Sequence, residues 1–274
     1  QASFYFALEC NAGCVAMPRK RKASGADGSG PPKRRKKVSV EDSVPDAATL
    51  RLPLYPDGFP REAPRDEALT ALPQLTFMGK VHLVSKANED VDWPRLESAE
   101  LLGFDTETQP IFSKGAAPNP TALLQLATDD ECWVFQLLPP VGVSQNTKKR
   151  LQALLEAPLP VKAGVGIHDD YRDLAEFHLP SMKAAAGVLD LQDIVRPYGL
   201  RQTGLRALAA TFLSRRVAKS QQCSNWGSSK LTSGQIWYAA ADAWAGRRLC
   251  EVLRGVFEGS ERWAPAQKLR LTDT

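Results

Sequence analysis

Two acidic residues follow a short apolar run in the first half of the chain. Asp105 and Glu107 come directly after the run 101–104, which is typical of a buried strand. Residues two apart on a strand point to the same face, so both carboxylates would project together. Like charges held that close favour a divalent cation between them, and Mg²⁺ prefers carboxylate oxygens. Two exposed acids on a loop would produce the same pattern without any chemistry.

A second acidic pair, Asp169 and Asp170, stands at the expected start of a helix. Asp170, Leu174 and Phe177 have the i, i+4, i+7 spacing of an apolar helix face. Asp169 belongs to the neighbouring acidic face, which solvent can cover. We therefore expect Asp170 to point inward, where an acid needs a partner such as a metal ion or its bound water.

The third candidate segment joins Tyr238 and Asp242 through three alanines. Thr232 and Gln235 have the spacing of a capping box, which predicts that a long helix begins before Tyr238. Tyr238 and Asp242 would then lie one turn apart on one helix face. The small alanines allow another element to approach closely. A core tyrosine beside a buried, hydrogen-bonded aspartate is the structural alternative.

The elements that position these residues are predicted from hydrophobic periodicity. Strands are expected at 81–84, 101–104, 122–127, 132–137 and 161–165, and helices at 146–155, 205–212 and from 232 onward. Strands with interspersed helices favour an α/β layer architecture. We expect a tail over residues 1–74, a folded domain over 75–260 and a C-terminal tail over 261–274.

The composition places limits on the class of protein. Hydrophobic residues make up 43% of the 274 residues, which is enough for a sizeable core. Apolar runs are too short to cross a bilayer, which takes about 18 residues, so we expect a soluble protein without a membrane partner. The five scattered cysteines do not resemble a disulfide framework.

Residues 18–75 have the Pro-, Gly-, Ser- and charge-rich composition of a disordered tail. Nine of the 35 Lys and Arg residues lie in two clusters, 19–22 and 33–37, so the rest of the chain is mildly acidic. Paired basic clusters resemble a bipartite nuclear localisation signal and predict a nuclear protein that binds an import receptor. A solvated charge run or an anchor on nucleic acid is the alternative. We expect Met17 to be the natural start of the chain.

The three acidic segments together resemble the motifs of the DEDD superfamily of 3′–5′ exonucleases, in the subclass with Tyr in the third motif. The resemblance is strongest to the branch of ribonuclease D and the Werner-syndrome exonuclease. The matching segments are FDTET (104–108), VGIHDD (165–170) and YAAADA (238–243), the last preceded by NW (225–226). The resemblance implies an RNase H-like fold, with a mixed sheet flanked by helices and the acids at one end.

This resemblance also implies a mechanism and a set of site residues. The catalytic set would be Asp105, Glu107, Asp170, Tyr238 and Asp242. The four acids would hold two divalent cations, Mg²⁺ or Mn²⁺, with Asp105 bridging both. Tyr238 would orient or deprotonate the attacking water, and 5′-mononucleotides would be released from the 3′ end of nucleic acid. DNA is the expected substrate; RNA trimming of the ribonuclease D type and an inactive, binding-only fold are the alternatives.

Contacts to the substrate are expected from further residues. The motif segments suggest Thr106, Trp226 and Lys230, although the family often has an Arg shortly after the Asn-Trp pair, where this chain has Ser228, Ser229 and Lys230. Basic side chains between the second and third motifs could also contact phosphates, or simply cover a solvated face: Arg201, Arg206, Arg215, Arg216 and Lys219.

Overall fold

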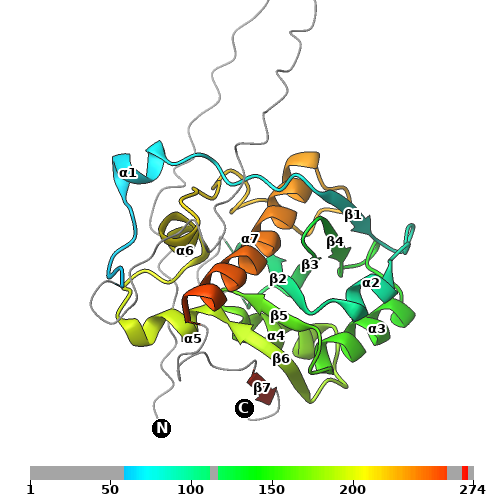
Figure 1. Ribbon diagram of the computed structural model, residues 1–274. Coiled ribbons are helices and arrows are strands. Elements are labelled where there is room, and N and C mark those ends of the chain that lie inside the picture. Colours follow the sequence, from blue (N-terminus) through cyan, green and yellow to red (C-terminus); the bar gives the residue numbers. More distant parts are fainter. Residues whose placement is uncertain (1–58, 112–116, 258–266, 271–274) are drawn as a thin grey trace, which may run out of the picture. The chain divides into compact units, whose positions relative to one another are not determined.

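The computed structural model of the chain describes residues 59–111 and 117–257, and the backbone of a strand at 267–270 (Figure 1). The basic clusters and Met17 lie outside the described residues. The expected nuclear localisation signal and the expected start of the chain therefore stay predictions.

Packing begins earlier than the boundary expected at residue 75. Phe59 is buried, and its ring lies 4.8 Å from that of Tyr198 and 5.6 Å from that of Phe212. A short helix, α1 (Asp66–Ala71), follows it. A single aromatic residue in a polar, Pro-rich stretch has no periodicity, so the sequence pattern did not reveal it. The expected C-terminal tail over 261–274 also contains a strand, Gln267–Arg270, that pairs with the sheet. The rest of the expected division stays a prediction.

A seven-stranded mixed sheet forms the centre of the described part, in the order β1-β4-β3-β2-β5-β6-β7. β3 runs antiparallel to β2 and β4, β5 runs parallel to β2 and β6, and β7 runs antiparallel to β6. The strands are β1 (Lys80–Val84), β2 (Leu101–Thr108), β3 (Thr121–Ala127), β4 (Glu131–Gln136), β5 (Val161–Gly164), β6 (Ala184–Asp190) and β7 (Gln267–Arg270).

Helices cover both faces of the sheet. α7 (Ser233–Phe257) lies across one face, against β2, β3 and β5 (Figure 1). α3 (Gln145–Glu156) and α4 (Ile167–Phe177) pack on the other face, where Leu151 and Tyr171 join the core. The remaining helices are α2 (Trp93–Ser98), α5 (Leu191–Val195), α6 (Leu205–Phe212) and a 3₁₀ turn at Arg196–Tyr198.

The two faces of β2 pack against different helices. Gly103 lies so close to α7 that a Cβ at this position would come within 2.0 Å of the carbonyl oxygen of Ala243. On the opposite face Phe104 stacks on Tyr171 of α4, with ring centroids 4.7 Å apart. Alternation along the strand therefore assigns odd-numbered residues of β2 to α7 and even-numbered residues to α4.

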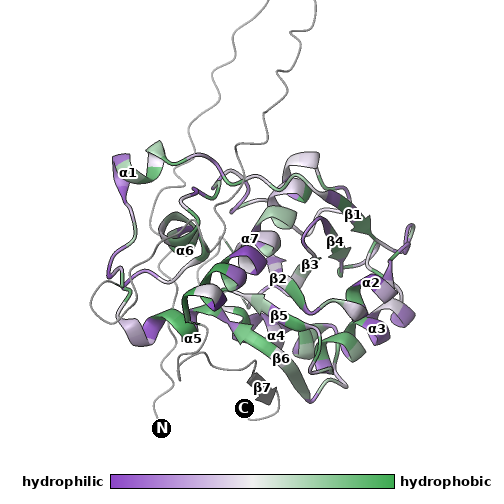
Figure 2. Ribbon diagram, viewed as in Figure 1, coloured by the Kyte–Doolittle hydropathy of each residue, from purple (hydrophilic) through white to green (hydrophobic). Residues whose placement is uncertain are grey.

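Hydropathy follows these layers. Figure 2 shows hydrophobic residues concentrated in β5 and β6, whereas α3 carries a hydrophilic and a hydrophobic side. The hydrophilic side of α3 faces away from the core cluster that contains Leu151, Leu154 and Leu155. Within the described residues, no helix combines the length and the apolar composition that a membrane span requires.

Candidate active site

Three carboxylates from two distant elements meet at one end of the sheet. Asp105 and Glu107 lie on β2, which runs through both motif residues to Thr108 instead of ending before them. Both project toward α7, which contributes Asp242. Carboxylate oxygens of Asp105, Glu107 and Asp242 lie within 4.8 Å of one another. The structure therefore brings together the first and third predicted motifs.

The charge of this cluster is unfavourable without a cation. Burial raises the pKa of Asp105 well above its usual range, and the nearby Asp242 and Asp170 raise it further. Burial, followed by the charge of Asp105, raises the pKa of Glu107 to about 10. Burial raises the pKa of Asp242 to about 7, although a hydrogen bond from Tyr238 opposes the change. A positive charge placed among these carboxylates would favour their ionised forms.

The donor set fits a hard divalent cation. Oδ1 of Asp242 is buried and has no hydrogen-bond partner among the described residues. A buried carboxylate oxygen without a partner is costly unless a ligand satisfies it. Three carboxylates that converge on one point offer the oxygen ligands that Mg²⁺ and Mn²⁺ prefer.

The second motif reaches the site through α4. Gly166 precedes the helix in the left-handed conformation, at φ 78°, which glycine adopts without strain. Oδ1 of Asp170 accepts a hydrogen bond of 2.5 Å from the hydroxyl of Thr106 on β2. Burial raises the pKa of Asp170 to about 7. Asp170 is not part of the group of three, but its charge acts on Asp105.

The expected division of labour between the two adjacent acids agrees with the geometry. The side chain of Asp169 is 87% exposed and pairs with Arg172, whereas Asp170 contacts β2. The predicted helix face was wrong in one member, because Phe177 is 38% exposed. The buried face of α4 runs through Ile167, Tyr171 and Leu174, so it shares Leu174 with the predicted stripe, and Asp170 borders it.

α7 begins with the predicted capping box. The amide of Thr232 donates to Oε1 of Gln235 (3.0 Å), and the amide of Gln235 donates to the Thr232 hydroxyl (3.2 Å). One turn further, the Tyr238 hydroxyl hydrogen-bonds the Asp242 carboxyl. Burial, followed by the charge of Asp242, raises the pKa of Tyr238 above its usual value. The raised pKa favours the protonated phenol, which suits orienting a water through a hydrogen bond.

Two of the three predicted substrate contacts have other partners. Trp226 is only 1% exposed, and the centroids of its ring and of the Tyr238 ring lie 5.9 Å apart. Trp226 therefore packs against Tyr238. The hydroxyl of Thr106 is engaged by Asp170, a pairing that sequence spacing could not reveal. Lys230 is exposed. Three residues before Lys230, the chain passes close to the end of β2. A Cβ at Gly227 would come within 2.6 Å of the side chain of Gln109, just beyond that strand.

Three of the five basic residues between the second and third motifs have different partners. Arg201 pairs with Glu62 at 2.9 Å, and Arg216 donates to the carbonyl of Leu72 at 3.1 Å. Arg206 lies within electrostatic range of Tyr238 and Asp242, and its Nε donates to the carbonyl of Val217 at 3.3 Å. Among the described basic side chains of this stretch, Arg206 is therefore the one whose charge reaches the carboxylate site.

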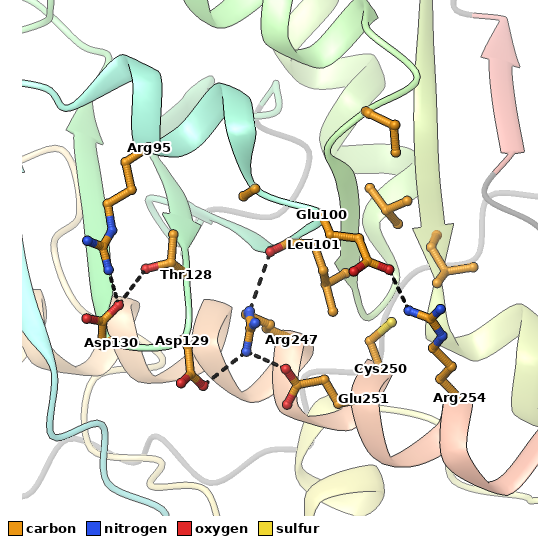
Figure 3. A pocket seen from close by; sticks show the side chains of 14 residues that line it. Arg95, Glu100, Leu101, Thr128, Asp129, Asp130, Arg247, Cys250, Glu251 and Arg254 are labelled. Atoms are coloured by element: carbon orange, nitrogen blue, oxygen red, sulfur yellow. Dashed lines mark hydrogen bonds and ion pairs between the residues drawn. The ribbon is translucent and has the colours of Figure 1, made fainter.

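A cavity of about 550 Å³ lies elsewhere, beside Leu101 at the opposite end of β2 from Glu107. Figure 3 shows that its arginines are engaged by acids around the wall. Arg247 binds Asp129 at 3.1 Å, and Arg254 binds Glu100 at 2.8 Å. Because these charges compensate one another and none of the motif acids lines it, the cavity is separate from the carboxylate site.

Comparison with known proteins agrees with this geometry. A family model described as 3′–5′ exonuclease matches residues 87–258. A "3′–5′ exonuclease" of Arabidopsis thaliana is 30% identical over 199 residues, which cover 66% of this chain and 66% of that protein. The bifunctional 3′–5′ exonuclease/ATP-dependent helicase WRN of Mus musculus is 29% identical over 186 residues, which cover 64% of this chain but 13% of that protein. The chain thus spans just under two thirds of the first relative and a small part of the second.

Solved structures confirm the expected RNase H-like α/β fold. The EXO domain of Aedes aegypti Nibbler superposes with a TM-score of 0.56 at 24% identity, covering 66% of this chain and 90% of that domain. RNase D of Trypanosoma brucei superposes with a TM-score of 0.56 at 16% identity, covering 69% of this chain and 68% of that chain. The family match extends from α2 to the end of α7 and includes all three motifs, so this chain belongs to the 3′–5′ exonuclease family of the DEDD superfamily.

Proposed function

We propose that this chain is a divalent-cation-dependent exonuclease that releases 5′-mononucleotides from the 3′ end of DNA. The observation that carries the proposal is the convergence of Asp105, Glu107 and Asp242 within 4.8 Å. The unpartnered Oδ1 of Asp242 adds a ligand atom that is already desolvated. Family membership supplies the direction of the reaction, from the 3′ end.

The four acids would hold the cations, and Tyr238 would orient the attacking water. Asp105, Glu107 and Asp242 would hold one cation, and Asp170 would support a second one from the side of α4. When bound, two cations such as Mg²⁺ or Mn²⁺ would activate the attacking water and neutralise charge at the scissile phosphate. Tyr238 keeps its proton and orients that water through a hydrogen bond.

The acidic pocket must also accept a polyanion. Arg206 lies near Tyr238 and Asp242, so a phosphate entering beside these residues meets a fixed positive charge. Lys230, exposed on the loop that follows Trp226, is the second basic residue proposed to contact a phosphate of the substrate. Phosphate contacts of this kind fix the register of the strand without reading its sequence.

DNA is proposed because the three motifs resemble those of the Werner-syndrome exonuclease branch, and the chain is 29% identical over 186 residues to the 3′–5′ exonuclease/helicase WRN of Mus musculus. RNA trimming is the nearest rival, since an RNase D of this fold was solved with the RNA U12. The 2′-hydroxyl is the group that would distinguish the two. A binding-only fold is the more distant rival, and the presence of all four acids and Tyr238 argues against it.

The test is digestion of DNA and RNA oligonucleotides of the same sequence, labelled at their 5′ ends. With Mg²⁺ we expect a ladder that shortens from the 3′ end, faster for DNA, and no ladder with a chelator or with Asp105→Asn. Faster shortening of RNA would favour the trimming alternative. Retention of the oligonucleotide without any shortening would favour the binding-only fold and refute the proposed activity.

A further inference from the structure

A polar side chain lies where the core should be apolar. Gln125 sits in the middle of β3, a strand in which every residue is buried, and is itself 0% exposed. Its neighbours Leu124 and Leu126 point to the α3–α4 face, so Gln125 points to the α7 face. The only indication in the sequence was one polar residue inside the apolar run 122–127.

The partner across the sheet is Asp105. β2 and β3 are antiparallel, and the register places Asp105 directly opposite Gln125. Side chains opposite each other in an antiparallel pair share a face, with Cβ atoms about 5 Å apart. α7 covers both, because Ala239 and Ala243 pack over this part of β3. Gln125 therefore shares with Asp105 a closed space beneath the helix that carries Asp242.

Both polar atoms of the Gln125 amide lack a partner. Neither Nε2 nor Oε1 has a hydrogen bond within residues 59–111 and 117–257. Lys162 on β5 is equally buried, yet its Nζ donates to the carbonyls of Leu154 and Ala157 at 3.2 and 2.6 Å. A buried amide without partners destabilises the fold more than an apolar side chain of the same shape. Packing alone therefore does not account for glutamine at this position.

We propose that Gln125 is a positioning residue: its side-chain amide, which has no hydrogen bond among the described residues, turns to the Asp105 carboxylate when a cation keeps that carboxylate ionised, and the hydrogen bond it then donates fixes the orientation of Asp105. The inference rests on the proposed exonuclease function. An ionised carboxylate only accepts hydrogen bonds, and an amide N–H is the neutral donor that adds no charge to the site. Groups that orient metal ligands in this way typically change metal affinity or activity by about 10- to 100-fold.

The test compares Gln125→Met with Leu126→Met. Methionine has nearly the shape of glutamine without its polar atoms, and Leu126 is the next residue of β3, buried on the opposite face. We expect Gln125→Met to weaken Mn²⁺ binding, measured by calorimetry, by about 10- to 100-fold. The metal-free variant should melt at least as high as wild type, because an unpaired polar group has been removed. Leu126→Met should bind Mn²⁺ as wild type does.

Separate measurement of kcat and KM provides a second readout. Gln125→Met should lower kcat and raise the Mn²⁺ requirement, and leave KM for the oligonucleotide near the wild-type value. Gln125→Glu, which keeps the shape but adds a like charge, should bind Mn²⁺ no better than Gln125→Met at low metal concentration. Wild-type Mn²⁺ affinity in Gln125→Met would overturn the inference, as would a large drop in the melting temperature of the metal-free protein.

The outcomes for Gln125 and for the proposed function are separable. If wild type binds Mn²⁺ but digests neither DNA nor RNA, the proposed function fails, and Gln125 is judged by metal affinity alone. If wild type digests nucleic acid and Gln125→Met binds Mn²⁺ equally well, only the role of Gln125 fails.

Discussion

The hydroxyl of Thr106 donates a 2.5 Å hydrogen bond to Oδ1 of Asp170 and so joins the central strand β2 to the first turn of α4. The two residues belong to different motifs and come within hydrogen-bond distance because α4 packs against β2. The position of each motif therefore restricts the position of the other. The site depends on how β2, α4 and α7 are placed relative to one another.

Removing this hydrogen bond should impair catalysis more than folding. Thr106→Val keeps the branched shape and removes the hydroxyl, which leaves Asp170 free to turn. We expect turnover to fall by about 10- to 100-fold, with a small change in melting temperature. Thr106→Ser, which keeps the hydroxyl, should recover most of the activity. Equal turnover in Thr106→Val and wild type would show that Asp170 needs no such support.

The two adjacent acids of α4 should differ strongly. Asp169 is exposed and pairs only with Arg172, so Asp169→Asn should keep most activity. Asp170→Asn removes a charge that acts on Asp105 and should lower turnover by several orders of magnitude. Single-turnover digestion of the labelled oligonucleotide measures both variants under the same conditions. The reverse ranking would mean that the solvent-facing acid is the functional one.

Substitutions of Tyr238 and Asp242 should distinguish water positioning from metal binding. Tyr238→Phe keeps the ring packed beside Trp226 and removes the hydroxyl, so turnover should fall by about 10²- to 10⁴-fold at unchanged Mn²⁺ affinity. Asp242→Asn should weaken both. Turnover, Mn²⁺ affinity and melting temperature are measured for each variant. Full activity in a folded Tyr238→Phe would reduce the tyrosine to a packing residue.

The stability of the metal-free protein should depend on pH through Asp242. Its pKa rises from 3.8 to about 7 on folding, so its contribution to stability is complete below about pH 4 and is lost as the pH rises through 7. The amide of Asp242→Asn does not ionise, so the variant does not lose this stability as the pH rises. With a chelator present, the variant should gain on the order of 2 kcal/mol of unfolding free energy over wild type between about pH 5 and pH 8. Denaturant unfolding at both pH values measures it, and a constant difference would contradict the prediction.

Nuclear entry should depend on the N-terminal basic clusters, which lie far along the chain from every motif. A fluorescent fusion that lacks residues 1–40 should stay in the cytoplasm, while the purified truncated protein still digests the oligonucleotide. Replacing the nine basic residues by Gln in the full chain is the matched control for length. Undiminished nuclear accumulation of either form would refute the import signal.

The sequence predicted those features that depend on local periodicity. The five expected strands and the helix α3 are present, and the capping box at Thr232 forms as expected. β6 was not predicted, because its Ala- and Gly-rich start lacks the β-branched residues typical of strands. The burial of Trp226 and the partner of Thr106 depend on contacts between distant segments, which no spacing rule contains.

The close approach of α7 to Gly103 has a consequence for the order in which the protein is made. Asp105 is synthesised early, but its counterpart Asp242 lies on the last long helix, and the two meet only when the backbone of Ala243 rests on Gly103. A ribosome-bound chain that stops before this helix holds two of the three clustered carboxylates, Asp105 and Glu107, and lacks the third. Catalytic competence therefore requires that α7 has been made and packed, and cannot appear with the first motif alone.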